Sequence, residues 1–400
     1  MRLLIRTGVK VIRGLVARRI IDEHASRWCI ISIVFWERLQ SKSLLNSNNM
    51  KIQKNKLPLL SFTLLAGNFL LGSTAWAEPV SSVDKFFRSG GVVTTPETYP
   101  TIETARQLLL AQKRAKVNLF AHTRKLTPTD DQPIVRMNRD TYYSFVVVDV
   151  SKGATITLPP VPEGKYISVQ PVTEDHRIQP MSYGSGTYHL ATHFGSHLYL
   201  IVRLDSTLSQ EEANALQDAM VIDAASAEPF LAEPVDKDAF EKLVELVTAD
   251  PGNVARGMFT APTDDSRGLY TFDKYTVGAA AGWGGAQLRD NLYESSPDYP
   301  AKGCYEATFE DPGNGAFWSF TIYDKRGFMF NDVAHMSSDI ASPNTDGTYT
   351  VRFVCGDNAA NNVPIANETG VFNFVVRHYI PSERVRDKGY RLAPLISQVE

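Results

Sequence analysis

Cysteine is scarce in this sequence, which has three in 400 residues. No two of them form a C-x-x-C pair, so the twin C-x-x-C motif of zinc sites is absent. The G-x-S-x-G elbow, the H-E-x-x-H motif and the phosphate-binding loop are absent too. Two short glycine clusters, residues 184–186 and 313–315, lack the strand-to-helix context of a nucleotide fingerprint and are interpreted as turns. The common catalytic classes are therefore unsupported.

Long apolar runs are also few, and the one with a cleavage pattern lies near the N-terminus. Met50 precedes three lysines, an apolar run over residues 57–72 and the small-residue site Ala75-Trp76-Ala77. This order is typical of a cleavable export signal, and the run is short for a membrane span. We predict that residues 50–77 are a signal peptide, that no stable membrane span remains after cleavage, and that the protein is periplasmic or secreted.

Residues 1–49 precede this signal and show no globular pattern. Because signals lie at true N-termini, we interpret these residues as an upstream extension from a mis-called start codon. A genuine basic extension, which would turn residues 57–72 into a signal anchor, is the alternative.

Basic side chains are in the minority once residues 1–77 are removed. That segment holds 12 of the 41 basic and three of the 44 acidic residues, so 29 basic and 41 acidic side chains remain, a formal net charge of −12. Such a surface repels phosphate backbones, and no basic stripe opposes the repulsion. We predict no nucleic-acid partner. Cys304 and Cys355 also remain, and an exported chain permits either a disulfide between them or two separate buried thiols.

The residue pattern predicts an α+β protein that is predominantly β. Helices are expected at residues 102–120, 209–224 and 237–248. Strands are expected at residues 142–150, 155–158, 166–172, 187–191, 198–204, 304–309, 317–323, 349–354 and 371–379. We predict an N-terminal β-rich domain with flanking helices at residues 78–205, a helical connector at 206–260, and a C-terminal jelly-roll-like antiparallel β-sandwich at 261–400.

Histidines are densest at His189, His193 and His197, shortly after Asp175-His176. A spacing of four would align them on a helix and suit a metal. Glycines and β-branched neighbours instead favour a strand and a turn, where residues four apart are too distant to chelate directly. We therefore predict no metal and no cofactor, with a site of His176, His189 and His193 as the less favoured alternative.

Polar residues gather at Arg136, Asn138, Arg139 and Asp140, at the entry to the predicted strand that begins with Tyr142. They could orient an anionic or hydroxyl-rich ligand, because Arg139 supplies a planar fork and Asp140 an acceptor. Alternatively, the carboxamide and carboxylate cap nearby amides while an arginine pairs with an aspartate to hold two domains together. Both interpretations remain open.

Several ordered motifs together resemble a known family. They are Asn138-Arg139-Asp140-Thr141-Tyr142-Tyr143-Ser144, Glu174-Asp175-His176, Gly184-Ser185-Gly186-Thr187-Tyr188, Gly282-Trp283-Gly284-Gly285, Phe317-Trp318-Ser319-Phe320-Thr321-Ile322-Tyr323-Asp324, Asp346-Gly347-Thr348 and Arg377-His378-Tyr379-Ile380-Pro381. The set resembles the exported bacterial family of paired uncharacterised domains, domain of unknown function 1254 followed by domain of unknown function 1214. The resemblance implies a β-rich N-terminal domain, a jelly-roll-like C-terminal domain and a homo-oligomer, and it implies no established activity.

The chain departs from this family at two places. Relatives carry a Gly-Cys-Asp-Gly turn and a later Asn-Cys-Leu-Pro segment. This chain has Cys355-Gly356-Asp357 and no cysteine in the later segment. The family's bridge therefore cannot form, and we expect Cys304 to replace the missing partner. Relatives also carry Arg-Leu-Tyr where this chain has Arg377-His378-Tyr379. If His378 faces the core, it needs a hydrogen-bond partner there.

Two tryptophans and the polar motifs lead to three functional hypotheses. Trp318 fits a core strand position, whereas Trp283, among glycines, is the better candidate to face a ligand. The first hypothesis is a periplasmic binding or assembly protein for an unknown small, polar or carbohydrate-like molecule. The second is a hydrolase and the third a metal-dependent enzyme. We expect ligand-binding residues Asn138, Arg139, Asp140, Tyr142, Glu174 and Trp283, and candidate catalytic residues Arg139, Asp140, Asp175 and His176. Residues 138–140 and 174–176 and Trp283 are expected to line one cavity at the domain junction.

Overall fold

The computed structural model describes residues 78–132, 135–248 and 272–399. The predicted export signal, residues 1–49 and Cys29 lie outside the described residues. Two β-rich halves follow each other along the described chain, and they share a large apolar cluster that includes Phe145 and Phe320. The protein is α+β and predominantly β, as the residue pattern predicted. Within the described residues, no helix is both long and apolar enough to cross a membrane.

The N-terminal half is built on a sheet of strand order β2-β3-β8-β5-β6. Its bounds are β2 Ala121–His122, β3 Thr141–Asp149, β5 Ile167–Thr173, β6 Ser182–Tyr183 and β8 His197–Asp205. The pair β3 and β8 is antiparallel and buried along its whole length, because both faces of the sheet are covered. Alternate residues of β3 therefore enter two different cores, as Phe145 and Val146 do.

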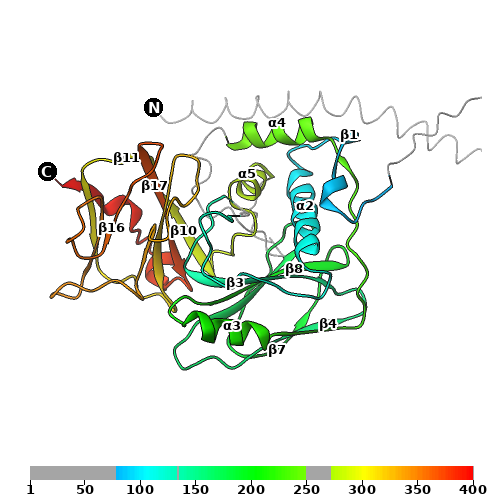
Figure 1. Cartoon of the computed structure of the whole chain (residues 1–400), viewed down its shortest axis with the longest axis horizontal. Helices are drawn as coiled ribbons and strands as arrows, with labels where there is room; N and C mark the ends of the chain where they lie inside the picture. Colours follow the sequence, from blue (N-terminus) through cyan, green and yellow to red (C-terminus); the bar gives the residue numbers. More distant parts are fainter. Residues whose placement is uncertain (1–77, 133–134, 249–271, 400) are drawn as a thin grey trace, which may run out of the picture. The chain divides into compact units, whose positions relative to one another are not determined.

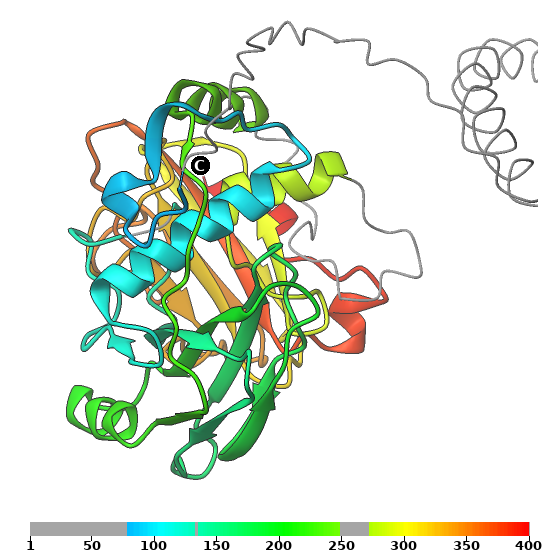
Figure 2. The ribbon, with the colours of Figure 1, turned by 90° about the vertical axis from the view of Figure 1, so that its right-hand side faces the viewer.

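Helices cover one face of this sheet, and a smaller sheet covers the other (Figure 1). The helices are α2 Tyr99–Arg114, α4 Lys237–Thr248 and α5 Phe272–Gly282, and α5 contacts both α2 and α4 (Figure 2). On the opposite face lie α3 Gln210–Asp218 and the sheet β7-β4-β9, with β4 Ala154–Leu158, β7 Gly186–Leu190 and β9 Val221–Ala224. Before α2 come η1 Val83–Lys85 and β1 Phe87–Val92.

The C-terminal half is a β-sandwich of two sheets. One sheet has the order β10-β17-β13-β14 with β11 beside β17, and the other has the order β16-β15-β12-β18. The bounds are β10 Asn291–Ser295, β11 Tyr299–Pro300, β12 Cys304–Phe309, β13 Trp318–Tyr323, β14 His335–Ser337, β15 Tyr349–Phe353, β16 Asn362–Val363, β17 Val371–Tyr379 and β18 Ile396–Val399, with α6 Glu383–Arg386 and η3 Ala393–Leu395 before β18. The two sheets meet through aromatic rings. The Phe353 ring is stacked on that of Phe374, with 5.4 Å between their centroids, and is tilted against that of Phe320, with 5.9 Å between their centroids.

The predicted strands occur within a residue or two of their expected bounds, whereas two predicted helices are too long. The helix expected at residues 102–120 ends at Arg114, because the backbone of Ala115 is already extended. The helix expected at residues 209–224 ends at Asp218. The next residues form β9, which pairs with β4, so tertiary pairing replaces the helical pattern there. The predicted start at Ser209 is confirmed by a capping box with Glu212.

A predicted domain boundary at residue 261 assigns α5 to the C-terminal domain, yet α5 packs on helices of the N-terminal half. The helix is rich in glycine and alanine, which lets it lie close to its neighbours. It connects the two halves rather than simply opening the second one.

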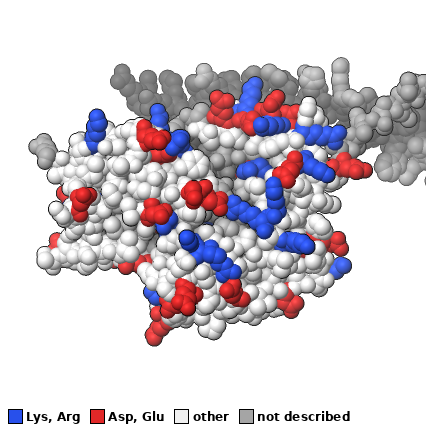
Figure 3. Space-filling view, in the orientation of Figure 1, with Lys and Arg blue, Asp and Glu red and all other residues white. Residues whose placement is uncertain are grey.

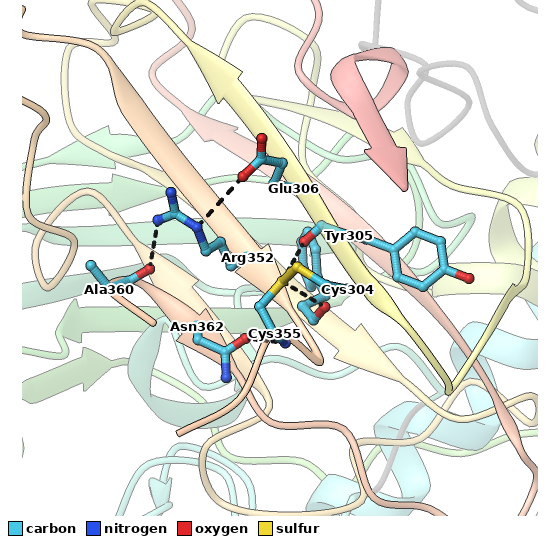
Figure 4. The surroundings of a disulfide bond; sticks show 8 residues. Cys304, Tyr305, Glu306, Arg352, Cys355, Ala360 and Asn362 are labelled. Atoms are coloured by element: carbon cyan, nitrogen blue, oxygen red, sulfur yellow. Dashed lines mark hydrogen bonds and ion pairs between the residues drawn. A yellow bond between two sulfur atoms is a disulfide. The ribbon is translucent and has the colours of Figure 1, made fainter. Parts of the chain in front are cut away.

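Cys304 and Cys355 form a disulfide, with 4.3 Å between their Cα atoms. Cys304 opens β12 and Cys355 follows β15, and these strands pair with Tyr305 opposite Phe353 (Figure 4). The strand pairing thus brings the two cysteines together, and Asn362 accepts a hydrogen bond from the Cys355 amide.

His378 lies on β17 with no exposed surface, and Glu294 on β10 is its partner at 2.6 Å. The same carboxylate accepts hydrogen bonds from the amides of Leu392 and Ala393. The histidine that sets this chain apart from the resembled family is therefore accommodated by a buried polar network, which also holds the segment before β18. Trp318 is buried in the core, as its strand position predicted.

Acidic and basic side chains lie among one another on the face drawn in Figure 3, and that face shows no continuous basic stripe.

Candidate functional site

Arg139 and Asp140 hold the two halves together. The Arg139 Nη1 atom donates to Asp332 Oδ1 at 2.9 Å and to the carbonyl of Thr127. Asp140 is almost fully buried, and its Oδ2 accepts from the hydroxyls of Ser319 at 2.6 Å and Tyr379 at 3.0 Å. These contacts match the interpretation of an arginine and an aspartate that join two domains.

Tyr142 and Glu174 also have structural contacts. Tyr142 lies in the core on the far face of the sheet, where its hydroxyl donates to the carbonyl of Leu208. The Glu174 Oε1 atom accepts from the amides of Ser196 at 2.7 Å and His197 at 2.8 Å, which fixes the turn before β8. Neither residue lines the cavity described below.

His176 is completely buried, with a positive φ of 63°. Its Nε2 accepts from the amide of Gly284 at 3.0 Å, so the ring carries its proton on Nδ1. Burial lowers the pKa of His176 to about 3, and the imidazole is therefore neutral near pH 7. Asp175 points elsewhere, to Thr173 and His193. Asp140 and His176 share no hydrogen bond, so the expected acid–base pair does not form.

The three histidines at a spacing of four do not converge. His189 is exposed on β7, His193 bonds to Asp175, and the buried His197 bonds through Nε2 to the carbonyl of Glu228. In the part of the chain that the structure describes, no three His, Cys, Asp or Glu side chains are grouped as metal ligands. The alternative site of His176, His189 and His193 has no geometric support.

A cavity lies where the two halves meet, and we call it the junction cavity. Its volume is about 90 Å³, which is room for several water molecules or a very small organic molecule. Its lining comprises Val135, Arg136, Met137, Asn138, Tyr143, Phe145, Ile201, Arg203, Gly282, Trp283, Gly284, Gly285, Asn291, Tyr293, Ser295, Val375, Arg377 and Tyr379. Of the six expected ligand-binding residues, only Asn138 and Trp283 belong to this lining; Arg139, Asp140, Tyr142 and Glu174 do not.

The loop after α5 forms one wall of the junction cavity. Gly284 is held from both sides, since its amide donates to His176 and its carbonyl accepts from Gln170 Nε2 at 2.7 Å. It has a φ of 73°, and an added Cβ would approach Ile201 to 3.1 Å, so this position favours glycine. Trp283 is fixed as well, because its indole N–H donates to Thr104. The wall is therefore rigidly positioned.

Among the described residues, three arginines line the junction cavity and no aspartate or glutamate does. Arg203 on β8 and Arg377 on β17 are 6% and 4% exposed. Arg377 donates to the Thr321 and Tyr323 hydroxyls and to the carbonyl of Arg136. Arg136 donates to Asn373 at 3.3 Å. The concentration of positive charge inside the protein is the main electrostatic feature of the site.

Sequence reasoning missed Arg203 and did not single out Arg377 as a site residue. Each interrupts an apolar strand, residues 198–204 and 371–379. A charged residue inside such a run is the signal that could have identified them, because arginine is rarely fully buried unless it is paired.

Family models match one segment in each half of the described chain. Residues 117–222 match the family model "Protein of unknown function (DUF1254)", and residues 294–383 match "Protein of unknown function (DUF1214)". The chain thus contains this pair of uncharacterised domains, in the order that the resemblance implied. The junction cavity draws Arg203 from the first matched segment and Arg377 from the second.

Solved structures similar to this chain include the VPA0106 protein from Vibrio parahaemolyticus, at 16% identity and a TM-score of 0.57, covering 76% of this chain and 98% of that one. An uncharacterised protein from Burkholderia cenocepacia aligns at 13% identity and a TM-score of 0.48, over 76% of this chain and 88% of that one. No curated protein matches the chain. The likeness to the Vibrio protein shows a shared fold.

Proposed function

We propose that this protein is an exported binding protein that holds a small organic molecule in the junction cavity. The observation that carries the proposal is the junction cavity itself, which is walled by both domains and combines aromatic rings with fixed polar groups. Small-molecule sites are typically concave, mostly apolar and equipped with a few oriented polar groups.

Polar atoms in the lining support this proposal. Asn291 is 3% exposed, and its Oδ1 is buried without a hydrogen-bond partner among the described residues. Asn138 is oriented by its own Oδ1, which accepts from the Tyr143 hydroxyl and from the Asp140 amide. A bound molecule with a hydroxyl or amine donor would satisfy the Asn291 oxygen, which is otherwise costly to bury.

Apolar groups supply the rest of the wall. Phe145, Ile201 and Trp283 belong to the shared apolar cluster and also line the cavity. The Trp283 ring packs edge-on against the Tyr199 ring, with 4.8 Å between the ring centroids, so Trp283 is held in place without a ligand. A preformed wall of this kind reduces the entropy lost on binding.

Export and a homo-oligomer are parts of the same proposal that rest on the sequence pattern and on the family resemblance. Intact-mass analysis of the secreted protein tests cleavage after Ala77, and size-exclusion chromatography with light scattering tests the oligomer. A mature N-terminus elsewhere than at Glu78 would contradict the predicted signal.

A cavity-filling variant tests the binding function directly. Ser295 lies on β10 and lines the cavity, so Ser295→Phe should place a ring inside it, while Ser295→Ala should leave it open. The full-length chain is screened by thermal shift against sugars, carboxylates, amides and alcohols. A ligand at 100 times its Kd stabilises the folded state by about 2.7 kcal/mol. We expect at least one compound to stabilise the wild type and Ser295→Ala but not Ser295→Phe. Equal shifts in all three proteins would contradict binding in this cavity.

A further inference from the structure

Arg203 is a buried cation that forms no ion pair with another described residue. Its guanidinium makes one hydrogen bond among the described residues, from Nη1 to Gln170 Oε1 at 2.8 Å, and lies 5.6 Å from the centre of the Tyr143 ring. No carboxylate lies within ion-pair distance in the described part of the chain. A buried charge is costly unless it is paired, so this arrangement requires an explanation.

The other two arginines of the cavity have acidic neighbours. Asp140 acts electrostatically on Arg377, and Asp298 acts on Arg136. Asp290 also acts electrostatically on Arg203, but its carboxylate accepts hydrogen bonds from the Met181 amide and the Tyr183 hydroxyl and none from the guanidinium. Among the described residues, Arg203 and Arg377 are the two almost fully buried arginines of the cavity, and Arg203 makes one hydrogen bond where Arg377 makes three.

The rings around Arg203 do not supply a negative charge. Its electrostatic neighbours include Tyr166, Tyr293 and Tyr379. Burial raises the pKa of Tyr166 to about 12 and raises the pKa values of Tyr293 and Tyr379. These phenols are therefore neutral near pH 7, and the charge of Arg203 faces the cavity uncompensated.

We infer that the ligand of the junction cavity is an organic monocarboxylate, and that its carboxylate binds to the guanidinium of Arg203. This inference rests on the proposed binding function. One uncompensated positive charge calls for one negative charge, and a planar guanidinium matches a planar carboxylate. Phe145, Ile201 and Trp283 then surround an apolar body. A phosphate dianion fits less well, because it would bring two charges to a wall that is mostly apolar.

Matched acids and amides test this inference on the full-length chain. Isothermal titration calorimetry compares acetate with acetamide, butyrate with butyramide, and benzoate with benzamide, and inorganic phosphate is measured separately. We expect at least one acid to bind at least about tenfold more tightly than its amide, because charge-assisted hydrogen bonds are stronger than neutral ones. Phosphate should bind more weakly than that acid.

Two substitutions at Arg203 separate charge from folding. Arg203→Met should weaken binding of the preferred acid at least about tenfold and leave its amide within about twofold. Without ligand, Arg203→Met should unfold at the same or a higher temperature, because an unpaired buried charge is removed. Arg203→Lys keeps the charge without the planar fork and should bind the acid with intermediate affinity. The exposed Arg88 on β1 provides the control Arg88→Gln, which should bind as the wild type does.

The outcomes distinguish this inference from the function on which it rests. If amides bind as well as acids and Ser295→Phe abolishes both, the cavity binds ligands but not by charge, and the carboxylate inference fails alone. If phosphate binds best, the ligand class is wrong. If acids bind equally to wild type and Ser295→Phe, both proposals fail. Retained acid preference in Arg203→Met would overturn the role of this residue.

Discussion

Removal of the disulfide between Cys304 and Cys355 should cost the protein a large part of its stability. The two cysteines are 51 residues apart in the sequence. In the chain-entropy model, a cross-link that closes a loop of this length lowers the entropy of the unfolded chain enough to contribute about 4 kcal/mol. This value is an upper estimate, because pairing of β12 with β15 in a compact unfolded state would reduce it.

Urea unfolding of the variant Cys304→Ser/Cys355→Ser measures the effect, with the wild type unfolded in the presence and absence of a reductant for comparison. We expect the double variant and the reduced wild type each to lose about 2–4 kcal/mol in the free energy of unfolding relative to the oxidised wild type. Intact mass of the wild type should rise by two hydrogens on reduction. An unchanged mass, together with equal stability of the double variant, would refute the bridge and its energetic role.

Three further predictions concern the residues around the junction cavity. In the wild type, the contribution of His176 to the free energy of unfolding is highest above pH 6.5. It falls by about 3 kcal/mol between pH 7 and 4, because the unfolded chain takes up a proton that the buried imidazole does not. His176→Asn should remove this pH dependence of the free energy of unfolding. Parallel stability curves for the two proteins would contradict this. Asp140→Ala removes the acceptor of two buried hydroxyls and should destabilise the protein by about 2–4 kcal/mol in urea unfolding; a loss below about 0.5 kcal/mol would show that the contacts are unimportant. A double-mutant cycle for Arg139→Ala and Asp332→Ala should give a coupling of about 0.5–1 kcal/mol, since Asp332 is 71% exposed, and a coupling near zero would remove this bridge from the account.

Strand positions could be predicted from local alternation, but their partners could not. The strand at residues 371–379 has the predicted bounds, because an apolar and β-branched run specifies extended backbone locally. Its pairing with both β10 and β13 depends on contacts distant in sequence. The helix predicted over the residues of β9 is wrong for the same reason, because these residues pair with β4.

The candidate site was predicted only in part, and the failures have one cause. Asn138 and Trp283 line the cavity as expected, because a polar strand entry and a glycine-flanked indole are visible in the sequence. Asp140 and His176 stood out as reactive residue types, but each is buried in structural contacts. Arg203 was overlooked because its neighbours are apolar, and only the fold shows that its charge has no partner. Reactivity of a residue type does not tell which side of a strand faces a cavity.

The most direct test of the account is a crystal structure of the full-length protein grown with butyrate. The account predicts butyrate in the junction cavity, with its carboxylate within hydrogen-bond distance of the Arg203 guanidinium and its alkyl chain against Phe145 and Trp283. Butyrate bound elsewhere, or a cavity closed by the surrounding side chains in the presence of butyrate, would contradict it.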